Sequence, residues 1–163
     1  MTPRLRTLAI VVAIVGLVPF VVCGIAALRV QDEPTTIRWL LALIGYGAVG
    51  LAFWGGMQWN SALAPATATD RPDGREHARL WQAVLPALIA WVALLAMTLP
   101  LYEAALAILA VGYIAALVVE VRWRRRSLLP AASMWLRWAM TIVIVVVLVT
   151  VLALRLLGAK IIF

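Results

Sequence analysis

The chain has 163 residues, of which 66% are hydrophobic and 13% are charged, and its formal net charge is +7. Soluble domains are about 45–50% apolar and about 25% charged, and a globule of this size has too little interior to hide the excess. The composition therefore excludes a soluble enzyme, a disordered chain and a disulfide-rich secreted module, and it predicts an integral membrane protein.

Crossing a bilayer takes about 20 residues of helix; three uncharged apolar runs reach that length, and two shorter runs reach it with the charged residues that flank them. Because lipid cannot satisfy open backbone groups, each run is predicted to be helical. Glu103 and Glu120 bound the fourth run, and the fifth requires Arg155 to reach the head groups. We expect an all-α fold, a polytopic integral membrane protein in which a bundle of five transmembrane helices forms a single domain (1–163), with spans at about 8–28, 39–59, 80–100, 103–121 and 138–157.

The first run follows Arg4 and Arg6, as the core of a signal peptide would. It is about twice as long as a typical signal-peptide core, and no small-x-small cleavage site follows it. Val21 and Val22 also precede Cys23, where a lipoprotein site would need small residues. We therefore expect a retained helix.

Basic residues alternate in density between the two sides of the predicted bundle. The N-terminal stretch, the second connection and the fourth connection together hold 10 Lys and Arg residues, and the other side holds 4. The positive-inside rule then predicts a cytoplasmic N-terminus and a periplasmic C-terminus in a bacterial inner membrane. The basic inner loops are expected to meet anionic lipid head groups. Because the charges lie between apolar runs, we expect no nucleic-acid binding.

Small residues form stripes on two of the predicted helices, where they would let another helix approach closely. Ala48, Ala52 and Gly56 are spaced by four in the second span, and Gly112 and Ala116 are spaced by four in the fourth. The alternative is that the glycine-rich face lines a substrate path.

Several short stretches, taken in order, resemble one protein family. They are GLVPF (Gly16–Phe20), YGAVGLAFWGGMQW (Tyr46–Trp59), VLPALIAW (Val84–Trp91), EVR (Glu120–Arg122), and LP (Leu129–Pro130) with WLR (Trp135–Arg137). This order resembles the domain-of-unknown-function 3429 (DUF3429) family, and the mitochondrial transmembrane protein 69 is similar. The resemblance implies a small multi-span inner-membrane protein and supplies no reaction. Gln58 stands where the family usually has His, and Glu120 where it more often has Asp; an amide keeps hydrogen bonding but cannot titrate.

The predicted orientation places six residues of these motifs in the inner half of the membrane, as a candidate structural or interaction site: Gln58, Trp59, Pro86, Glu120, Trp135 and Arg137. We expect Glu120 and Arg137 to form an interhelical ion pair with Gln58 nearby, and such a pair would fix helix packing more readily than perform chemistry. The alternative partner of Glu120 is Arg124, four residues along the same helix.

The predicted function is that of a structural or assembly factor that binds a membrane-protein complex or a second copy of itself. No predicted span has a charge near its centre, which argues against ion-coupled transport, although a small oligomeric permease or channel is an alternative. A lipid-head-group enzyme using Glu120 and His77 would lack a recognisable nucleophile and base. We therefore expect no enzymatic activity, no cofactor and no metal.

Overall fold

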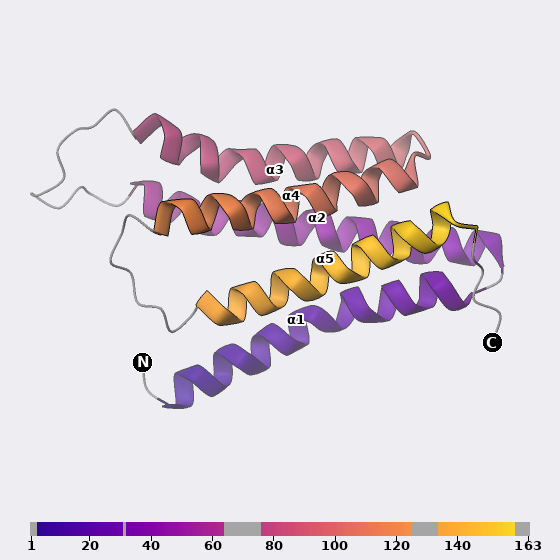
Figure 1. Cartoon of the computed structure of the whole chain (residues 1–163), viewed down its shortest axis with the longest axis horizontal. Helices are drawn as coiled ribbons and strands as arrows, with labels where there is room; N and C mark the ends of the chain where they lie inside the picture. The colour runs from indigo at the N-terminus through magenta and orange to yellow at the C-terminus, as the bar shows by residue number, and fades with distance from the viewer. Residues whose placement is uncertain (1–2, 31, 64–75, 125–133, 159–163) are drawn as a thin grey trace, which may run out of the picture.

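The computed structural model describes residues 3–30, 32–63, 76–124 and 134–158, and nearly all of them are helical. The five helices are α1 (Pro3–Arg29), α2 (Glu33–Leu63), α3 (Glu76–Thr98), α4 (Tyr102–Arg124) and α5 (Met134–Leu156). They lie side by side with successive helices running in opposite directions (Figure 1). The predicted all-α fold is confirmed.

Four of the described helices are long and apolar enough to span a membrane: Thr7–Arg29, Glu33–Met57, Tyr102–Arg122 and Trp135–Leu156. In α3, the described apolar stretch is the shorter Ala83–Thr98. The large side chains on the outside of the bundle are mostly aliphatic, as expected for helices that face lipid.

Helix α2 begins before the apolar run that predicted it. Asp32 caps the helix, because its Oδ2 atom accepts a hydrogen bond from the backbone N–H of Thr35 at 3.1 Å. Glu33 in the first turn adds a favourable interaction with the helix dipole. The first connection is therefore much shorter than the Arg29–Arg38 link that hydropathy indicates.

The other described connection joins α3 to α4, and it is the tight turn that the sequence predicts. The backbone N–H of Leu101 donates to the carbonyl of Ala96 at 3.0 Å, which closes the last turn of α3, and α4 begins at Tyr102. The two helices form an antiparallel hairpin.

Helix α2 is the centre of the bundle, since it contacts α1, α3 and α4, whereas α5 closes the bundle by contacting α1 and α4. Leu40, Leu43, Ile44 and Leu51 of α2 are fully buried. On the other side, α1 lies so close to α5 that a Cβ atom on Gly24 would come within 2.7 Å of the Val147 side chain.

A cluster of aromatic rings joins three helices in the core. The ring of Phe20 on α1 packs edge-on against Tyr46 of α2, at 5.0 Å between centroids, and against Tyr113 of α4, at 6.3 Å. The Tyr46 hydroxyl donates to the carbonyl of Gly16, and the Tyr113 hydroxyl donates to the carbonyl of Gly47, both at 2.9 Å. Each phenol therefore satisfies its polar atom on a neighbouring helix.

Candidate functional site

The predicted ion pair between Glu120 and Arg137 is present in the structure. Glu120 lies in the last two turns of α4 and Arg137 in the first turn of α5. Arg137 Nη1 donates to Glu120 Oε1 at 3.0 Å, with the two side chains 32% and 11% exposed respectively. One turn further along α5, the buried Thr141 hydroxyl donates to the Arg137 carbonyl at 2.9 Å. The carboxylate therefore lies within the bundle, and the guanidinium connects it to the surface.

Trp54 of α2 adds a third helix to this site, and the sequence analysis did not predict it. The guanidinium carbon of Arg137 lies 6.0 Å from the centroid of the Trp54 ring, within cation–π range. The Trp54 indole nitrogen is buried and has no hydrogen-bond partner among the described residues. We call Trp54, Glu120 and Arg137 the Trp54 cluster. The signal that could have found Trp54 is its place one helical turn before Gln58, on the same side of α2.

The other residues predicted for this site have different surroundings. Gln58 and Trp59 belong to the last turns of α2, and their side chains lie outside the described part of the structure. Pro86 of α3 packs against Gly55 of α2. Trp135 is 49% exposed on α5. Because it precedes Arg137 by two residues, it faces away from the ion pair.

Only part of the predicted small-residue stripe on α2 packs against another described helix. Ala48 is buried and Ala52 is half-buried, but Gly56 is exposed, and no described atom lies within 4 Å of a Cβ built on it. The close approach falls on Gly55, where a Cβ atom would come within 2.6 Å of the Ala83 carbonyl oxygen. A spacing of four residues drifts by about 40° per step on an α-helix. Gly56 is therefore about 80° away from Ala48, whereas Gly55 is within about 20° of it.

The stripe on α4 faces its neighbours as expected. A Cβ atom on Gly112 would come within 2.8 Å of both the Leu51 side chain on α2 and the Ile89 side chain on α3. Ala116, one turn further, is 7% exposed. Small residues at these positions let three helices pack closely.

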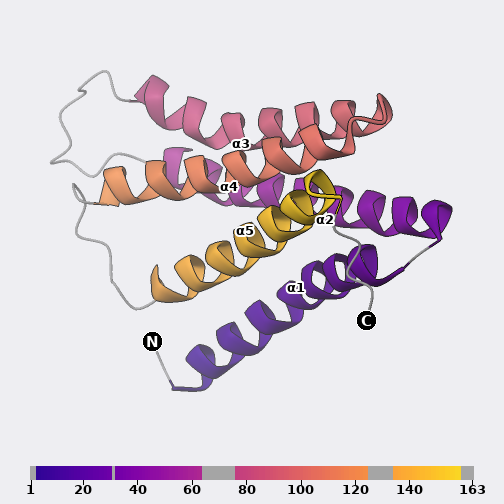
Figure 2. The same ribbon diagram turned by 45° about the vertical axis from the view of Figure 1, so that its right-hand side comes forward.

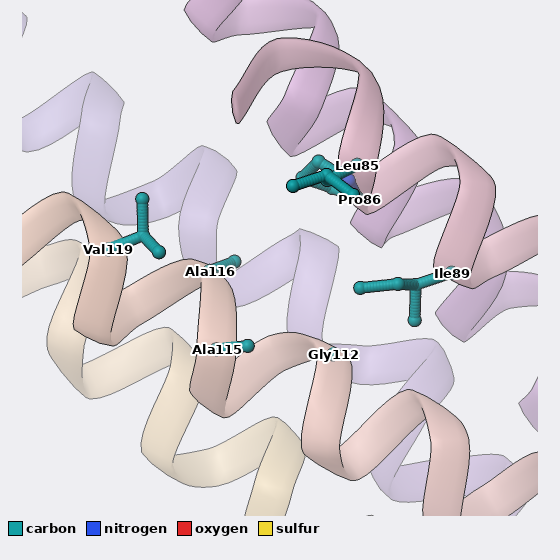
Figure 3. Close-up of a pocket in the computed structure, with 7 residues that line it drawn as sticks. All are labelled: Leu85, Pro86, Ile89, Gly112, Ala115, Ala116 and Val119. Carbon is teal, nitrogen blue, oxygen red and sulfur yellow. The ribbon is translucent and has the colours of Figure 1, made fainter. Parts of the chain in front are cut away.

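A groove lies between α3 and α4, with a cavity of about 80 Å³ and an almost wholly apolar lining (Figure 3). We call it the α3–α4 groove. Figure 3 shows its lining residues, which are Leu85, Pro86, Ile89, Gly112, Ala115, Ala116 and Val119.

A second ion pair joins α4 and α5 at the other end of the bundle, and the sequence analysis missed it. Arg155 Nε donates to Glu103 Oε1 at 2.9 Å, and the side chains are 30% and 39% exposed. The sequence pattern indicates only that each of these groups lies in the head-group region. In the part of the chain that the structure describes, no three His, Cys, Asp or Glu residues are grouped as metal ligands would be.

Residues 5–153 match the family described as a protein of unknown function, DUF3429. The chain belongs to the DUF3429 family. No curated protein and no solved structure matches it. The similarity to the mitochondrial transmembrane protein 69 stays a prediction.

The motifs that carry the DUF3429 resemblance meet at two levels of the bundle. Gly16 and Phe20 of the first motif contact Tyr46 of the second, in the aromatic core. Trp54 of the second motif, Glu120 and Arg137 meet in the Trp54 cluster. In this DUF3429 protein, motif residues therefore fix how α1, α2, α4 and α5 pack.

Proposed function

We propose that this protein is a structural or assembly factor that binds a larger membrane-protein complex. The observation that supports this proposal is how the polar groups inside the bundle are used. Tyr46 and Tyr113 donate to backbone carbonyls of a neighbouring helix, and Glu120 of α4 is bound by Arg137 of α5. These groups hold the helices together, as befits a rigid scaffold, and the described cavity of about 80 Å³ is apolar.

The partner is proposed to bind the outer face of α2. Gly45 and Gly56 are 11 residues apart and so lie within about 20° of each other around the helix, with no described atom within 4 Å of a Cβ built on either. Between them, Val49 is 66% and Phe53 is 68% exposed. Two glycines flanking large apolar side chains allow a transmembrane helix of the partner to approach closely.

The protein is further proposed to lie in a bacterial inner membrane with all five helices crossing it. The 23 residues of α3 measure about 34 Å at 1.5 Å per residue, which is enough to cross. The excess of Lys and Arg in the N-terminal stretch and in the second and fourth connections supports a cytoplasmic location for that end and a periplasmic C-terminus. The basic end would then meet anionic lipid head groups.

Site-specific photocrosslinking in native membranes tests the docking proposal. A photoreactive amino acid at Val49 or Phe53 is expected to capture a membrane protein other than this chain, which mass spectrometry then identifies. The matched control is Val12 on α1, which is 69% exposed and lies on a different helix. Capture of the same partner with equal yield from Val12, or capture of lipid alone from Val49 and Phe53, would contradict the proposal. Capture of a second copy of the chain would replace the assembly role with self-association.

A further inference from the structure

The α3–α4 groove arises because the two helices diverge. They meet at the tight turn after Thr98 and separate towards their other ends (Figures 1 and 2). On the α4 side, the half-buried Ala115 has a side chain too short to fill the space between the helices. The groove opens sideways at Leu85, which is 47% exposed. In a membrane, this opening faces hydrocarbon.

A cation lies at the wide end of the groove. Arg122 is exposed and follows the lining residue Ala115 by seven positions. Seven residues complete about two turns of helix, so Arg122 lies on the same side of α4 as Ala115 and about 10 Å further along it. Glu120 is two residues from Arg122 and therefore faces away from it, towards Arg137 on α5. The two charged residues of the Glu120–Arg122 motif therefore face opposite sides of α4: Glu120 lies inside the bundle, and Arg122 lies on the side of the groove.

Helix α3 contributes an aromatic side chain at the same end. Trp81 is 61% exposed and precedes the lining residue Leu85 by one helical turn. Exposed tryptophan is typical of the head-group level of a bilayer, where its ring lies among the upper acyl chains and its N–H reaches water. An apolar groove that ends between a tryptophan and an arginine has the polarity of one phospholipid molecule.

We propose that the α3–α4 groove binds one acyl chain of an anionic phospholipid whose phosphate group is bound by Arg122. The apolar lining excludes a polar ligand, because a polar group there would lose its hydrogen bonds. The arginine fork matches a phosphate, and Glu120, the acid two residues before Arg122, is bound by Arg137 on α5. The proposal requires that the protein be embedded in a membrane and does not depend on the docking role proposed above.

Photoreactive lipids test this proposal with the full chain in nanodiscs. The probes are phosphatidylglycerol and phosphatidylcholine, each carrying a diazirine in the acyl chain, and mass spectrometry maps the labelled residues. We expect phosphatidylglycerol to label Leu85, Ile89, Ala115 and Val119 in preference to phosphatidylcholine. Arg122→Gln is expected to reduce that preference by about fivefold, which is the effect of one arginine near an anionic surface.

The charge control is Arg4→Gln, which removes an exposed arginine from the same end of the bundle but from α1, and it is expected to leave the labelling unchanged. Ala115→Phe should fill the groove and remove labelling by both probes, whereas Val111→Phe, at a residue that is 65% exposed and does not line the groove, should not. If Ala115→Phe does not fold, Ala115→Leu replaces it, and Arg122→Gln stands as an independent test.

Two results would overturn the proposal. One is even labelling of exposed residues on all helices, which is the behaviour of bulk lipid. The other is groove labelling that is equal for the two head groups and unchanged by Arg122→Gln. Neither result affects the protein crosslinks expected from Val49 and Phe53, so failure of lipid binding and failure of the docking role are distinguishable.

Discussion

At the scale of single residues, the Glu120–Arg137 pair is expected to contribute measurably to stability, because Glu120 is only 11% exposed. Glu120→Gln leaves the partly buried Arg137 guanidinium without its counter-charge. Removing one partner of a fully buried pair costs about 3–5 kcal/mol. Because Arg137 is 32% exposed, we expect a loss of about 1–3 kcal/mol. The measurement is the unfolding free energy in mixed micelles titrated with sodium dodecyl sulfate.

The second ion pair, between Arg155 and Glu103 at the other end of the bundle, supplies the matched control for this prediction. Arg155 and Glu103 are joined at a similar distance, but both side chains are about one-third exposed. Arg155→Gln should therefore cost less than about 1 kcal/mol, because neither side chain of this pair is as buried as Glu120, which is 11% exposed. Equal losses of unfolding free energy from Glu120→Gln and Arg155→Gln would show that the Glu120–Arg137 pair is no more important to packing than the Glu103–Arg155 pair.

The buried phenol of Tyr113 supports a second prediction for a single residue. Tyr113→Phe removes the bond from the hydroxyl to the Gly47 carbonyl at 2.9 Å and leaves the ring against Phe20. Interhelical hydrogen bonds in membrane proteins contribute about 0.6 kcal/mol on average and about 1.7 kcal/mol at most, so the unfolding free energy should fall within that range. Tyr102→Phe at the half-buried start of α4 should have little effect, and a loss as large as that of Tyr113→Phe would refute the assignment.

The sequence predicts the inner ion pair but not its aromatic neighbour, and the reason is physical. Glu120 and Arg137 terminate apolar runs at one end of the bundle, so their approach follows from the order of the helices. Trp54 lies within an apolar run. The sequence pattern there is the same whether the tryptophan ring faces lipid or faces a cation, so it does not predict the contact with Arg137. Hydropathy places Glu103 and Arg155 each at the membrane surface, and only the packing of α4 on α5 shows that they meet.

At the scale of helices, α2 and α3 approach each other closely at Gly55. A methyl group at Gly55 would come within 2.6 Å of the Ala83 carbonyl oxygen, which belongs to the backbone and cannot rotate away. Gly55→Ala is therefore expected to push the helices apart and to cost about 1–3 kcal/mol, measured as a lower melting temperature in detergent.

The adjacent glycine is the control for this prediction. A Cβ atom on Gly56 meets no described atom within 4 Å, so Gly56→Ala should be neutral or slightly stabilising, because alanine favours helix more than glycine does. A drop in melting temperature from Gly56→Ala as large as that from Gly55→Ala would contradict this placement of the α2–α3 contact.

Hydropathy predicts that each of these helices exists, but it does not predict their ends or the faces they present. Helix α2 begins at Glu33 because Asp32 caps it, which is a local hydrogen bond that an apolar window cannot detect. A spacing of four residues predicts that Ala48, Ala52 and Gly56 share one face of α2. Because the helix has 3.6 residues per turn, Gly55 lies nearer the face of Ala48 than Gly56 does.

At the scale of the whole molecule, the membrane topology is the prediction to test. In chains truncated after Asp70 and after Pro100, a fused alkaline phosphatase should be inactive at the first position and active at the second, because α3 lies between them. A fusion after Phe163 should also be active, which reports a periplasmic C-terminus. Activity at both Asp70 and Pro100 would show that α3 does not cross.

The charges of α4 and α5 have a consequence for biosynthesis. The two acids of α4, Glu103 and Glu120, are each matched by an arginine of α5, one at either end of the helix pair. A ribosome releases α4 first, so its carboxylates reach their counter-ions only when α5 follows it out of the translocon. A nascent chain arrested before Arg137 would therefore hold both carboxylates of α4 without the α5 arginines that bind them in the finished fold.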